Sequence, residues 1–198
     1  DYLGNPNLDN NICPQEKDYN DALEVCKKIG IPLKRVDFVR EYWDFVFTYF
    51  LDELKKGRTP NPDVMCNKYI KFDSFFEYAM KQGFDKVATG HYASNAEEND
   101  FTYLTRAKDQ NKDQTYFLCQ VEKSKIAKTI FPLAHLEKPE IRQIAAELNL
   151  ESVATKKDST GICFIGERNF RQFLSNYLPS KDGDIVDVNT GKGIARHV

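Results

Sequence analysis

The sequence lacks the features expected of a membrane protein, a secreted protein or a zinc-binding protein. No apolar run approaches the roughly 18 residues that a membrane span requires, and no segment resembles a signal peptide. The chain has 5 cysteines, and no two of them form a C-x-x-C pair or lie at zinc-finger spacing from a histidine. We therefore expect a cytoplasmic protein without a structural metal, in which the cysteines are reduced.

An excess of basic residues is also lacking. The 28 Lys and Arg residues and 30 Asp and Glu residues give a net charge of −2. Phosphate neutralisation needs clustered Lys and Arg, so this balance argues against a protein that binds nucleic acid over its whole surface, but not against a local basic path. The 14 Phe and 10 Tyr residues provide enough bulky apolar side chains for a substantial core.

Segments with helical spacing of apolar residues alternate with short strand-like runs. The predicted helices cover residues 18–29, 43–54, 70–79, 122–130, 138–149 and 170–177. The predicted strands cover residues 33–38, 86–89 and 102–106, followed by a hairpin of 184–188 and 194–198. The alternation over about residues 18–165 predicts an α/β fold with a partly parallel sheet. Because 198 residues suit one domain and part of another, we expect a domain at 1–165 and the beginning of a second, small domain at 166–198.

The first candidate site is the proline-rich segment N-P-D-V-M-C-N at residues 61–67. Pro60 and Pro62 stiffen the backbone, and rigid loops on a scaffold often carry binding or catalytic groups. Asp63 precedes Cys66 by three residues, so a single turn can bring the carboxylate and the thiol to one place. The alternative is that Cys66 is a buried residue at the start of a helix and that Asp63 caps this helix.

The second candidate site is A-T-G-H-Y at residues 88–92, where a predicted strand ends in Gly90. Ligands of open α/β sheets bind beyond the carboxyl ends of the strands, and glycine allows close approach of the backbone. Gly90 is therefore a candidate nucleotide contact. His91 could act as a base, contact RNA or be a structural histidine, and the structural role is the commonest of the three.

The third candidate site is K-K-D-S-T-G-I-C-F-I-G at residues 156–166. The basic residues and hydrogen-bond donors before Cys163 favour its thiolate, which is the form that attacks as a nucleophile or carries a persulfide. The alternative is a core position, because Ile162 and Phe164 flank the thiol.

In this order, the segments resemble one family, the bacterial tRNA-specific 2-thiouridylases, which place sulfur on C2 of the wobble uridine. The resemblance is nearly continuous from about residue 18 to residue 188. Its strings are GRTPNPDVMCNKYIKF at 57–72, ATGHYA at 88–93, NKDQTYFL at 111–118, FPLAHLEKPEIRQIA at 131–145 and KKDSTGICFIGERNFRQFL at 156–174. The resemblance implies an ATP-pyrophosphatase-like domain of the adenine-nucleotide alpha-hydrolase type, followed by the beginning of a central tRNA-binding domain.

The resemblance implies a role for the cysteine of each of two motifs. Cys163 corresponds to the cysteine that bears the persulfide, and Cys66 corresponds to its partner nucleophile. Attack by Cys66 would leave a transient Cys66–Cys163 disulfide, which suits a reducing compartment because it forms only during the reaction. Asp63 resembles the general acid/base, and Asn61 and Pro62 complete the loop that contacts the target base.

The resemblance also implies ligands and partners. Gly90 corresponds to an ATP contact, and ATP, with Mg²⁺, would turn the C2 oxygen of the uridine into a leaving group. His91 resembles a tRNA-discrimination position, and Lys112, Asp113 and Gln114 resemble a tRNA-contact segment. The wobble base must leave the anticodon stack to reach such a site, and an upstream protein must donate the sulfur.

The sequence departs from the family in ways that bear on activity. It contains neither the phosphate-binding string S-G-G-x-D-S nor the C-terminal β-barrel, so we expect a fragment that cannot adenylate tRNA.

One alternative function is a tRNA-binding or sulfur-carrier module without adenylation. Another is a different ATP pyrophosphatase, in which the paired cysteines would be dispensable. Three cysteines match no catalytic motif: Cys26 and Cys119, expected in the core, and Cys13, which has no assigned role.

Overall fold

The structure, a computed structural model, describes residues 14–156, 170–179 and 182–197. It begins with helix α1 (Pro14–Ile29), which contains the helix predicted from residue 18 onward. A segment without regular secondary structure follows at residues 31–38.

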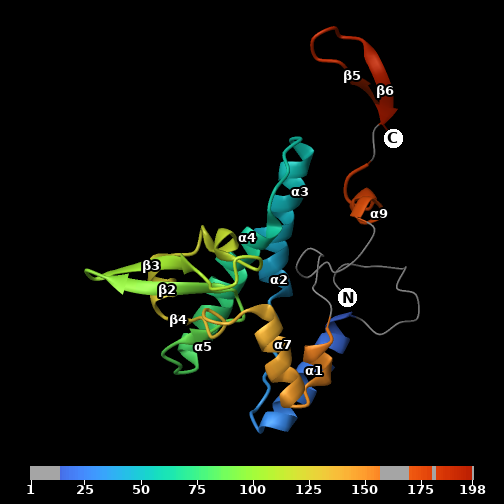
Figure 1. Ribbon diagram of the computed structural model, residues 1–198. Helices are drawn as coiled ribbons and strands as arrows, with labels where there is room; N and C mark the ends of the chain where they lie inside the picture. The colour runs from blue at the N-terminus through green and yellow to red at the C-terminus, as the bar shows by residue number, and fades with distance from the viewer. Residues whose placement is uncertain (1–13, 157–169, 180–181, 198) are drawn as a thin grey trace.

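Two long helices form the centre of the molecule (Figure 1). The first runs without interruption through α2 (Val39–Tyr42), the π-helical turn η1 (Trp43–Phe47) and α3 (Thr48–Lys55). It ends before Gly57, which has a φ of +74°, a backbone conformation that favours glycine. The helix and the glycine stop predicted from the sequence are both confirmed.

The second long helix consists of α4 (Pro62–Cys66), the π-helical η2 (Asn67–Ser74) and α5 (Phe75–Lys81). The spacing of the apolar residues did not predict η1 or η2. A π-helical turn is only slightly wider than an α-helical one, so over a few residues the same side chains still share a face. The two long helices share a buried apolar cluster, here called the thiol cluster, made of Val46, Val64, Met65, Cys66 and Ile70.

The strands of the central region form two pairs. The short strand β1 (Val87–Ala88) pairs in parallel with β4 (Thr129–Ile130). The strands β2 (Ala93–Glu98) and β3 (Phe101–Arg106) form an antiparallel hairpin, which projects from the body of the molecule in Figure 1. The parallel pair together with the helices around it confirms the predicted α/β fold with a partly parallel sheet.

Asn95 attaches the hairpin to the strand pair. Its Nδ2 donates to the backbone oxygen of Ile126 at 2.9 Å and to that of Thr129 at 3.0 Å. A second buried cluster lies beneath, made of Phe72, Ala93, Leu118, Ile126, Phe131 and Ala134. It joins the second long helix and the hairpin to two short helices, η3 (Thr115–Leu118) and α6 (Lys123–Ala127).

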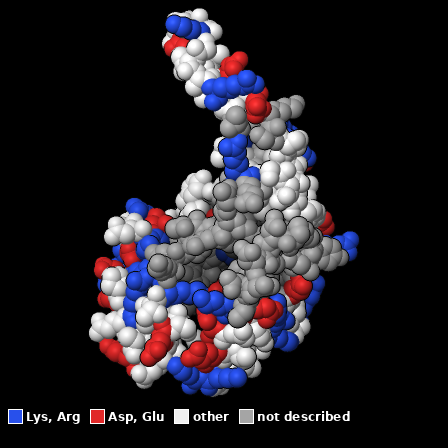
Figure 2. Space-filling model, turned by 90° about the vertical axis from the view of Figure 1, so that its right-hand side faces the viewer, with Lys and Arg blue, Asp and Glu red and all other residues white. Residues whose placement is uncertain are grey.

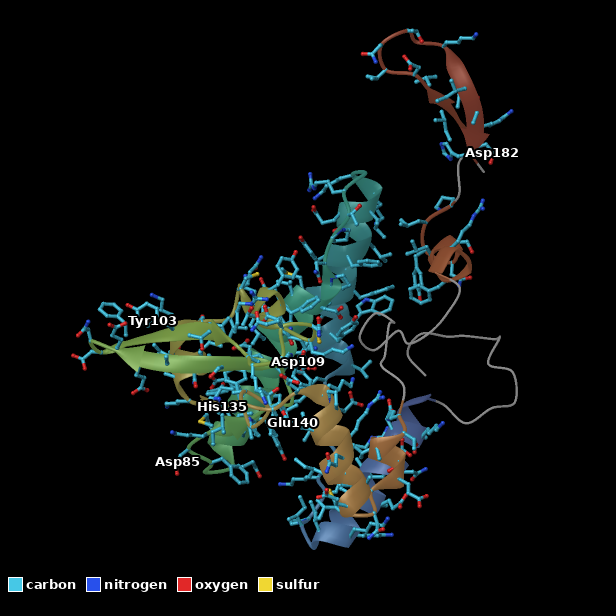
Figure 3. All side chains as sticks on the ribbon, in the orientation of Figure 1. Asp85, Tyr103, Asp109, His135, Glu140 and Asp182 are labelled. Carbon is cyan, nitrogen blue, oxygen red and sulfur yellow. The ribbon has the colours of Figure 1, made fainter. Side chains whose placement is uncertain are left out.

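Helix α7 (Lys138–Glu147) begins with a capping box, in which Glu137 and Glu140 each bond the backbone N–H at the other residue. The loop after β3 is tied to this helix start by Asp109, which Figure 3 labels beside Glu140. The Asp109 carboxylate accepts hydrogen bonds from the backbone N–H of Lys138, Asn111 and Lys112. Those bonds, from Lys138 first, lower the pKa of Asp109, so the loop is held by a charged carboxylate. The short α8 (Glu151–Ala154) follows.

The C-terminal part comprises α9 (Phe170–Ser175) and the antiparallel hairpin of β5 (Gly183–Val186) and β6 (Gly193–His197). Phe173 of α9 packs against Phe47 and Phe50 on the first long helix. The hairpin stands apart from the body in Figure 1, and its strands are largely exposed to solvent. The hairpin predicted from the sequence is confirmed, whereas the domain boundary after residue 165 falls outside the described residues.

Three local predictions were wrong. The helix predicted at residues 122–130 ends at Ala127, because Thr129 and Ile130 pair with β1 as the strand β4. Residues 33–38 do not form a strand, because no strand lies alongside them in the described part of the chain to share a ladder of hydrogen bonds. Cys119 is exposed rather than buried, because it follows the last residue of the short η3, whose buried side chain is Leu118. Cys26 is half-buried, at the margin of the predicted core position.

No described helix has both the length and the apolar character needed to cross a membrane. Within the same residues, no group of three or more His, Cys, Asp or Glu side chains is arranged to hold a metal ion.

Candidate functional site

The N-P-D segment forms the start of the helix that carries Cys66. The Asn61 Oδ1 accepts hydrogen bonds from the backbone N–H of Asp63 at 3.1 Å and of Val64 at 3.2 Å, which makes Asn61 the N-cap of α4. Pro62 occupies the first helical position, where a missing N–H has no consequence. The cap is therefore Asn61 and not Asp63, which corrects the alternative considered from the sequence.

Because Asn61 provides the cap, the Asp63 carboxylate is not used in this way. Asp63 is half-buried, and Cys66, which follows three residues later, has an exposed fraction of 0%. Residues three apart in a helix lie on one face, so the carboxylate and the thiol share a side of α4. The proximity of the two groups stays a prediction, whereas the alternative prediction that Cys66 is buried near a helix start is confirmed.

An ion pair anchors the loop before this helix. Arg58 donates from Nη2 to the Glu53 Oε1 at 2.6 Å and from Nε to the Glu53 Oε2. The hydrogen bonds from Arg58 lower the pKa of Glu53 to about 2. The pair therefore stays charged at all but strongly acidic pH and fixes the loop to the end of α3.

Cys66 lies inside the thiol cluster, bordered by the side chains of Tyr69 and Phe117. A thiol in this position reaches another molecule only when the packing around it opens locally. The Cys66 thiol is therefore shielded from solvent.

Shielding leads to a prediction on alkylation rates. In the native protein we expect iodoacetamide to modify the exposed Cys119 at least about tenfold faster than the buried Cys66. Site-resolved mass spectrometry of peptides after short exposures measures the two rates. In denaturant the two rates should converge, and equal rates in the native protein would contradict the burial of Cys66.

Gly90 and His91 follow β1, as the sequence predicted. A Cβ built on Gly90 meets no atom within 4 Å, so the backbone at the end of this strand is open to a ligand. His91 is 9% exposed, its Nδ1 lies 2.7 Å from the Thr89 Oγ1, and its ring lies beside that of Phe72. Burial, and secondarily the charge of Lys71, lower the pKa of His91 to about 4. The imidazole is therefore neutral at pH 7.

The neutral, buried histidine makes stability depend on pH. In the unfolded chain His91 takes up a proton near its ordinary pKa of 6.5, whereas in the folded chain it does so only near 4. Stability is therefore present above pH 6.5 and falls as the pH is lowered toward 4. Between pH 7 and pH 5 we expect His91 to account for about 2 kcal/mol of this loss. Urea unfolding of wild type and His91→Gln at both pH values measures it, and equal pH dependence in the two proteins would contradict the assignment.

The segment Lys112–Gln114 is held against the residues that follow β1. The Gln114 Oε1 accepts from the Tyr92 backbone N–H at 2.9 Å, and the Gln114 backbone N–H donates to the Tyr92 oxygen at 2.9 Å. Asp113 accepts from Arg106 at 2.8 Å and also from the backbone N–H and the hydroxyl of Thr115. Two segments that the sequence singled out separately therefore lie together.

Asn67 is a site residue that the sequence analysis missed. It follows Cys66 and is 2% exposed, and its Nδ2 donates to the Phe117 oxygen at 3.0 Å. Its Oδ1 is buried and has no hydrogen-bond partner among the residues that the structure describes, at a cost of about 1–3 kcal/mol. The only signal in the sequence is a polar residue directly after the apolar run Val64-Met65-Cys66.

A comparison with families of known proteins decides the relationship of this chain. The family described as the tRNA methyl transferase HUP domain matches residues 4–167. The chain belongs to this family. The match confirms the adenine-nucleotide alpha-hydrolase type of fold predicted from the sequence.

Individual relatives of this HUP domain family carry a more specific name. The chain is 57% identical over 202 residues to the tRNA-specific 2-thiouridylase MnmA of Mesoplasma florum. The alignment covers 100% of this chain and 54% of the relative. The chain is 58% identical over 190 residues to the protein of the same name from Staphylococcus carnosus, which covers 96% of the chain and 51% of that protein. The chain thus spans about half the length of the curated relatives it matches. The resemblance to the tRNA-specific 2-thiouridylases is confirmed.

Most of the third candidate segment, residues 157–166, is not placed by the structure. Cys163 lies outside the described residues, and so does Cys13, so the Cys66–Cys163 pairing stays a prediction. The residues expected to contact the base, Asn61 and Pro62, lie at the start of the helix with Asp63.

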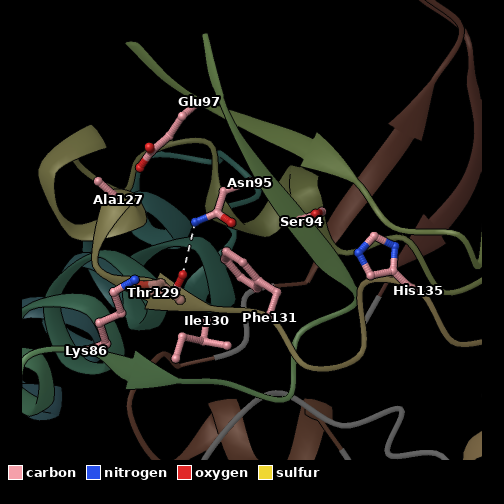
Figure 4. A pocket seen from close by; sticks show the side chains of 9 residues that line it. All are labelled: Lys86, Ser94, Asn95, Glu97, Ala127, Thr129, Ile130, Phe131 and His135. Carbon is pink, nitrogen blue, oxygen red and sulfur yellow. Dashed lines mark hydrogen bonds between the residues drawn. The ribbon is translucent and has the colours of Figure 1, made fainter. Parts of the chain in front are cut away.

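None of the described candidate site residues named from the sequence lines the pocket shown in Figure 4. This open pocket, of about 460 Å³, lies between β2 and β4. Its lining comprises Lys86, Ser94, Asn95, Glu97, Ala127, Thr129, Ile130, Phe131 and His135. Its lining contains both a positive side chain, Lys86, and a negative one, Glu97. The pocket lies where Asn95 joins the β2–β3 hairpin to the β1–β4 strand pair, and not around Cys66.

The surface of this family member is not uniformly basic. On the face that Figure 2 shows, Lys and Arg side chains gather in a band across the lower body, among scattered Asp and Glu side chains. A band of this kind fits the local basic path that a net charge of −2 allows.

Proposed function

We propose that the protein acts in 2-thiolation of tRNA, as the part of a tRNA-uridine 2-sulfurtransferase that transfers persulfide sulfur to C2 of the wobble uridine in an ATP-dependent reaction. The observation that carries the proposal is the start of α4, where a half-buried carboxylate and a buried thiol share one face. Phe117, three residues beyond the family's K-D-Q string, packs against the same thiol cluster. The names of the 55–58% identical relatives support the same reaction class.

Cys66 is the proposed nucleophile and Cys163 the proposed persulfide carrier. The Cys66 thiolate attacks the Sγ of Cys163 in its persulfide, so that a Cys66–Cys163 disulfide forms and the terminal sulfur leaves as hydrosulfide. The hydrosulfide attacks C2 of the uridine, and the adenylated C2 oxygen departs as part of AMP. Asp63 takes the proton of the incoming sulfur as the bond forms. An external thiol then reduces the disulfide.

The remaining roles concern activation and recognition. When bound with Mg²⁺, ATP supplies the activation of the C2 oxygen as a leaving group, and the open backbone at Gly90 suits a contact with it. Asn61 and Pro62 contact the target base, whereas His91 and the segment Lys112–Gln114 recognise the tRNA. The partners are a tRNA with its wobble base turned out of the stack and an upstream sulfur-donor protein, in the cytoplasm.

The test is nucleoside analysis of tRNA incubated with the protein in its full natural length, ATP, Mg²⁺ and a persulfide donor. The proposal predicts 2-thiouridine at the wobble position that depends on both ATP and donor. Binding of tRNA without any thiolation would instead favour a tRNA-binding or sulfur-carrier module.

A further inference from the structure

The segment Lys112–Gln114 and the turn that follows it are hydrogen-bonded at two places, to Tyr92 and to Asn67. On one side, Gln114 brackets Tyr92 with its backbone N–H and its side-chain oxygen, both at 2.9 Å. On the other side, the backbone oxygen of Phe117 accepts the Asn67 amide at 3.0 Å, and the Phe117 N–H donates to the Gln114 oxygen at 3.1 Å. The single turn from Gln114 to Phe117 therefore connects Tyr92, directly before β2, to Asn67, the residue next to Cys66.

The orientation of the Asn67 amide is determined by this contact. Only the NH₂ end can donate to the Phe117 oxygen, so the Oδ1 points to a place where no partner lies within the described structure. For stability alone, an apolar side chain of the same shape would serve about as well as an asparagine with one unmatched end. The amide is better explained by the position that it enforces on Phe117.

The side chains of the K-D-Q string differ in what they do. The Gln114 side chain points inward to the backbone of Tyr92, and the Asp113 carboxylate is bonded to Arg106 and Thr115. Because the side chains of Gln114 and Asp113 are bonded inside the fold, they influence bound RNA by fixing the position of the backbone around them. Lys112 adds a positive charge to the segment, and positive charge attracts RNA phosphates.

We infer that Asn67 and Gln114 are positioning residues, which together set the distance and orientation of the tRNA-contact segment relative to Cys66. This inference rests on the proposed function. Its chemical content is that Gln114 is needed as an acceptor for the Tyr92 N–H and not as a donor to RNA, and that Asn67 is needed as a donor to Phe117.

Variants at Gln114 separate the two roles. Gln114→Glu keeps an oxygen that can accept from the Tyr92 N–H but loses the amide donors and adds a negative charge, whereas Gln114→Leu keeps only the shape. If Gln114 positions the segment, Gln114→Leu lowers kcat by about tenfold or more with little change in KM, and Gln114→Glu is clearly less impaired than Gln114→Leu. If Gln114 contacts RNA, Gln114→Glu is the worse variant, and KM rises.

A variant at Asn67 tests the hydrogen bond between the Asn67 amide and the Phe117 backbone oxygen. Asn67→Leu should lower kcat by about tenfold while Tm stays within about 4 °C of wild type, because the variant removes the unmatched oxygen together with the useful donor. All variants are assayed as full-length proteins, with hydrogen exchange of the Tyr92 amide as a readout that needs no activity. Faster exchange in Gln114→Leu than in Gln114→Glu supports the bridge.

The outcomes separate the inference from the proposed function. A wild-type protein that makes no 2-thiouridine contradicts the proposed function. An active wild type in which Gln114→Glu is as impaired as Gln114→Leu, or in which Asn67→Leu has unchanged kcat, contradicts the inference alone.

Discussion

Replacing Cys66 by serine is expected to lower wobble-uridine thiolation by at least about 1,000-fold, because a serine oxygen neither attacks a persulfide efficiently nor forms a disulfide. Serine nearly matches the shape of cysteine, so the thiol cluster should still assemble. Thiolation is measured as 2-thiouridine per tRNA under single-turnover conditions, with the fold verified by circular dichroism.

The matched control for this variant is Cys119→Ser, since Cys119 lies at the exposed end of η3 and has no role in the proposed reaction. It should retain activity within about twofold of wild type. A folded Cys66→Ser protein with undiminished thiolation would remove Cys66 from the chemistry and would favour an ATP pyrophosphatase that does not use paired cysteines.

Truncating Leu118 to alanine is expected to lower the free energy of unfolding by about 2–5 kcal/mol. Leu118 is 1% exposed and packs in the cluster that joins the second long helix, the β2–β3 hairpin and α6. Urea unfolding gives the change. Thiolation should fall too, because Leu118 fixes η3, whose Phe117 faces the thiol cluster.

Leu148→Ala provides the control for this truncation, because the same side chain at position 148 is 56% exposed at the end of α7. Its effect should stay below about 1 kcal/mol. If the two truncations cost the same, Leu118 does not occupy the core position described.

The sequence predicted those elements whose apolar spacing is strong and whose ends are marked. The first long helix has a wide apolar stripe and a glycine stop, and the structure has both. The predicted strand at residues 33–38 fails because a strand depends on a neighbour, which no local pattern of residues specifies. Cys119 fails for a related reason, since the direction of a side chain in a one-turn helix depends on what packs beneath it.

The candidate site was predictable as a set of residues but not as an arrangement. The motifs identified Asp63, Cys66 and Gly90, whereas only the coordinates identify Asn61 as the cap and Gln114 as a partner of the Tyr92 backbone. A hydrogen bond between positions 22 residues apart leaves no periodic trace in the sequence. Asn67 was missed because its contact, with Phe117, spans 50 residues.

The proposed reaction depends on a shielded thiol that is held one turn from a carboxylate and beside the segment proposed to contact RNA. Burial protects Cys66 from adventitious reagents, and the bridge through Asn67 and Gln114 keeps the contact segment in register with it. Binding of tRNA to the segment can then be coupled to the exposure of the Cys66 thiol through the turn from Gln114 to Phe117.

The most direct test is the stoichiometry of disulfide formation in a single turnover of the full-length protein, loaded with persulfide and mixed with tRNA and ATP in the absence of reductant. Peptide mass spectrometry then measures the disulfide, and nucleoside analysis measures the 2-thiouridine. The account predicts one Cys66–Cys163 disulfide for each 2-thiouridine formed. Thiolated tRNA accompanied by a reduced, unmodified Cys66 would contradict it.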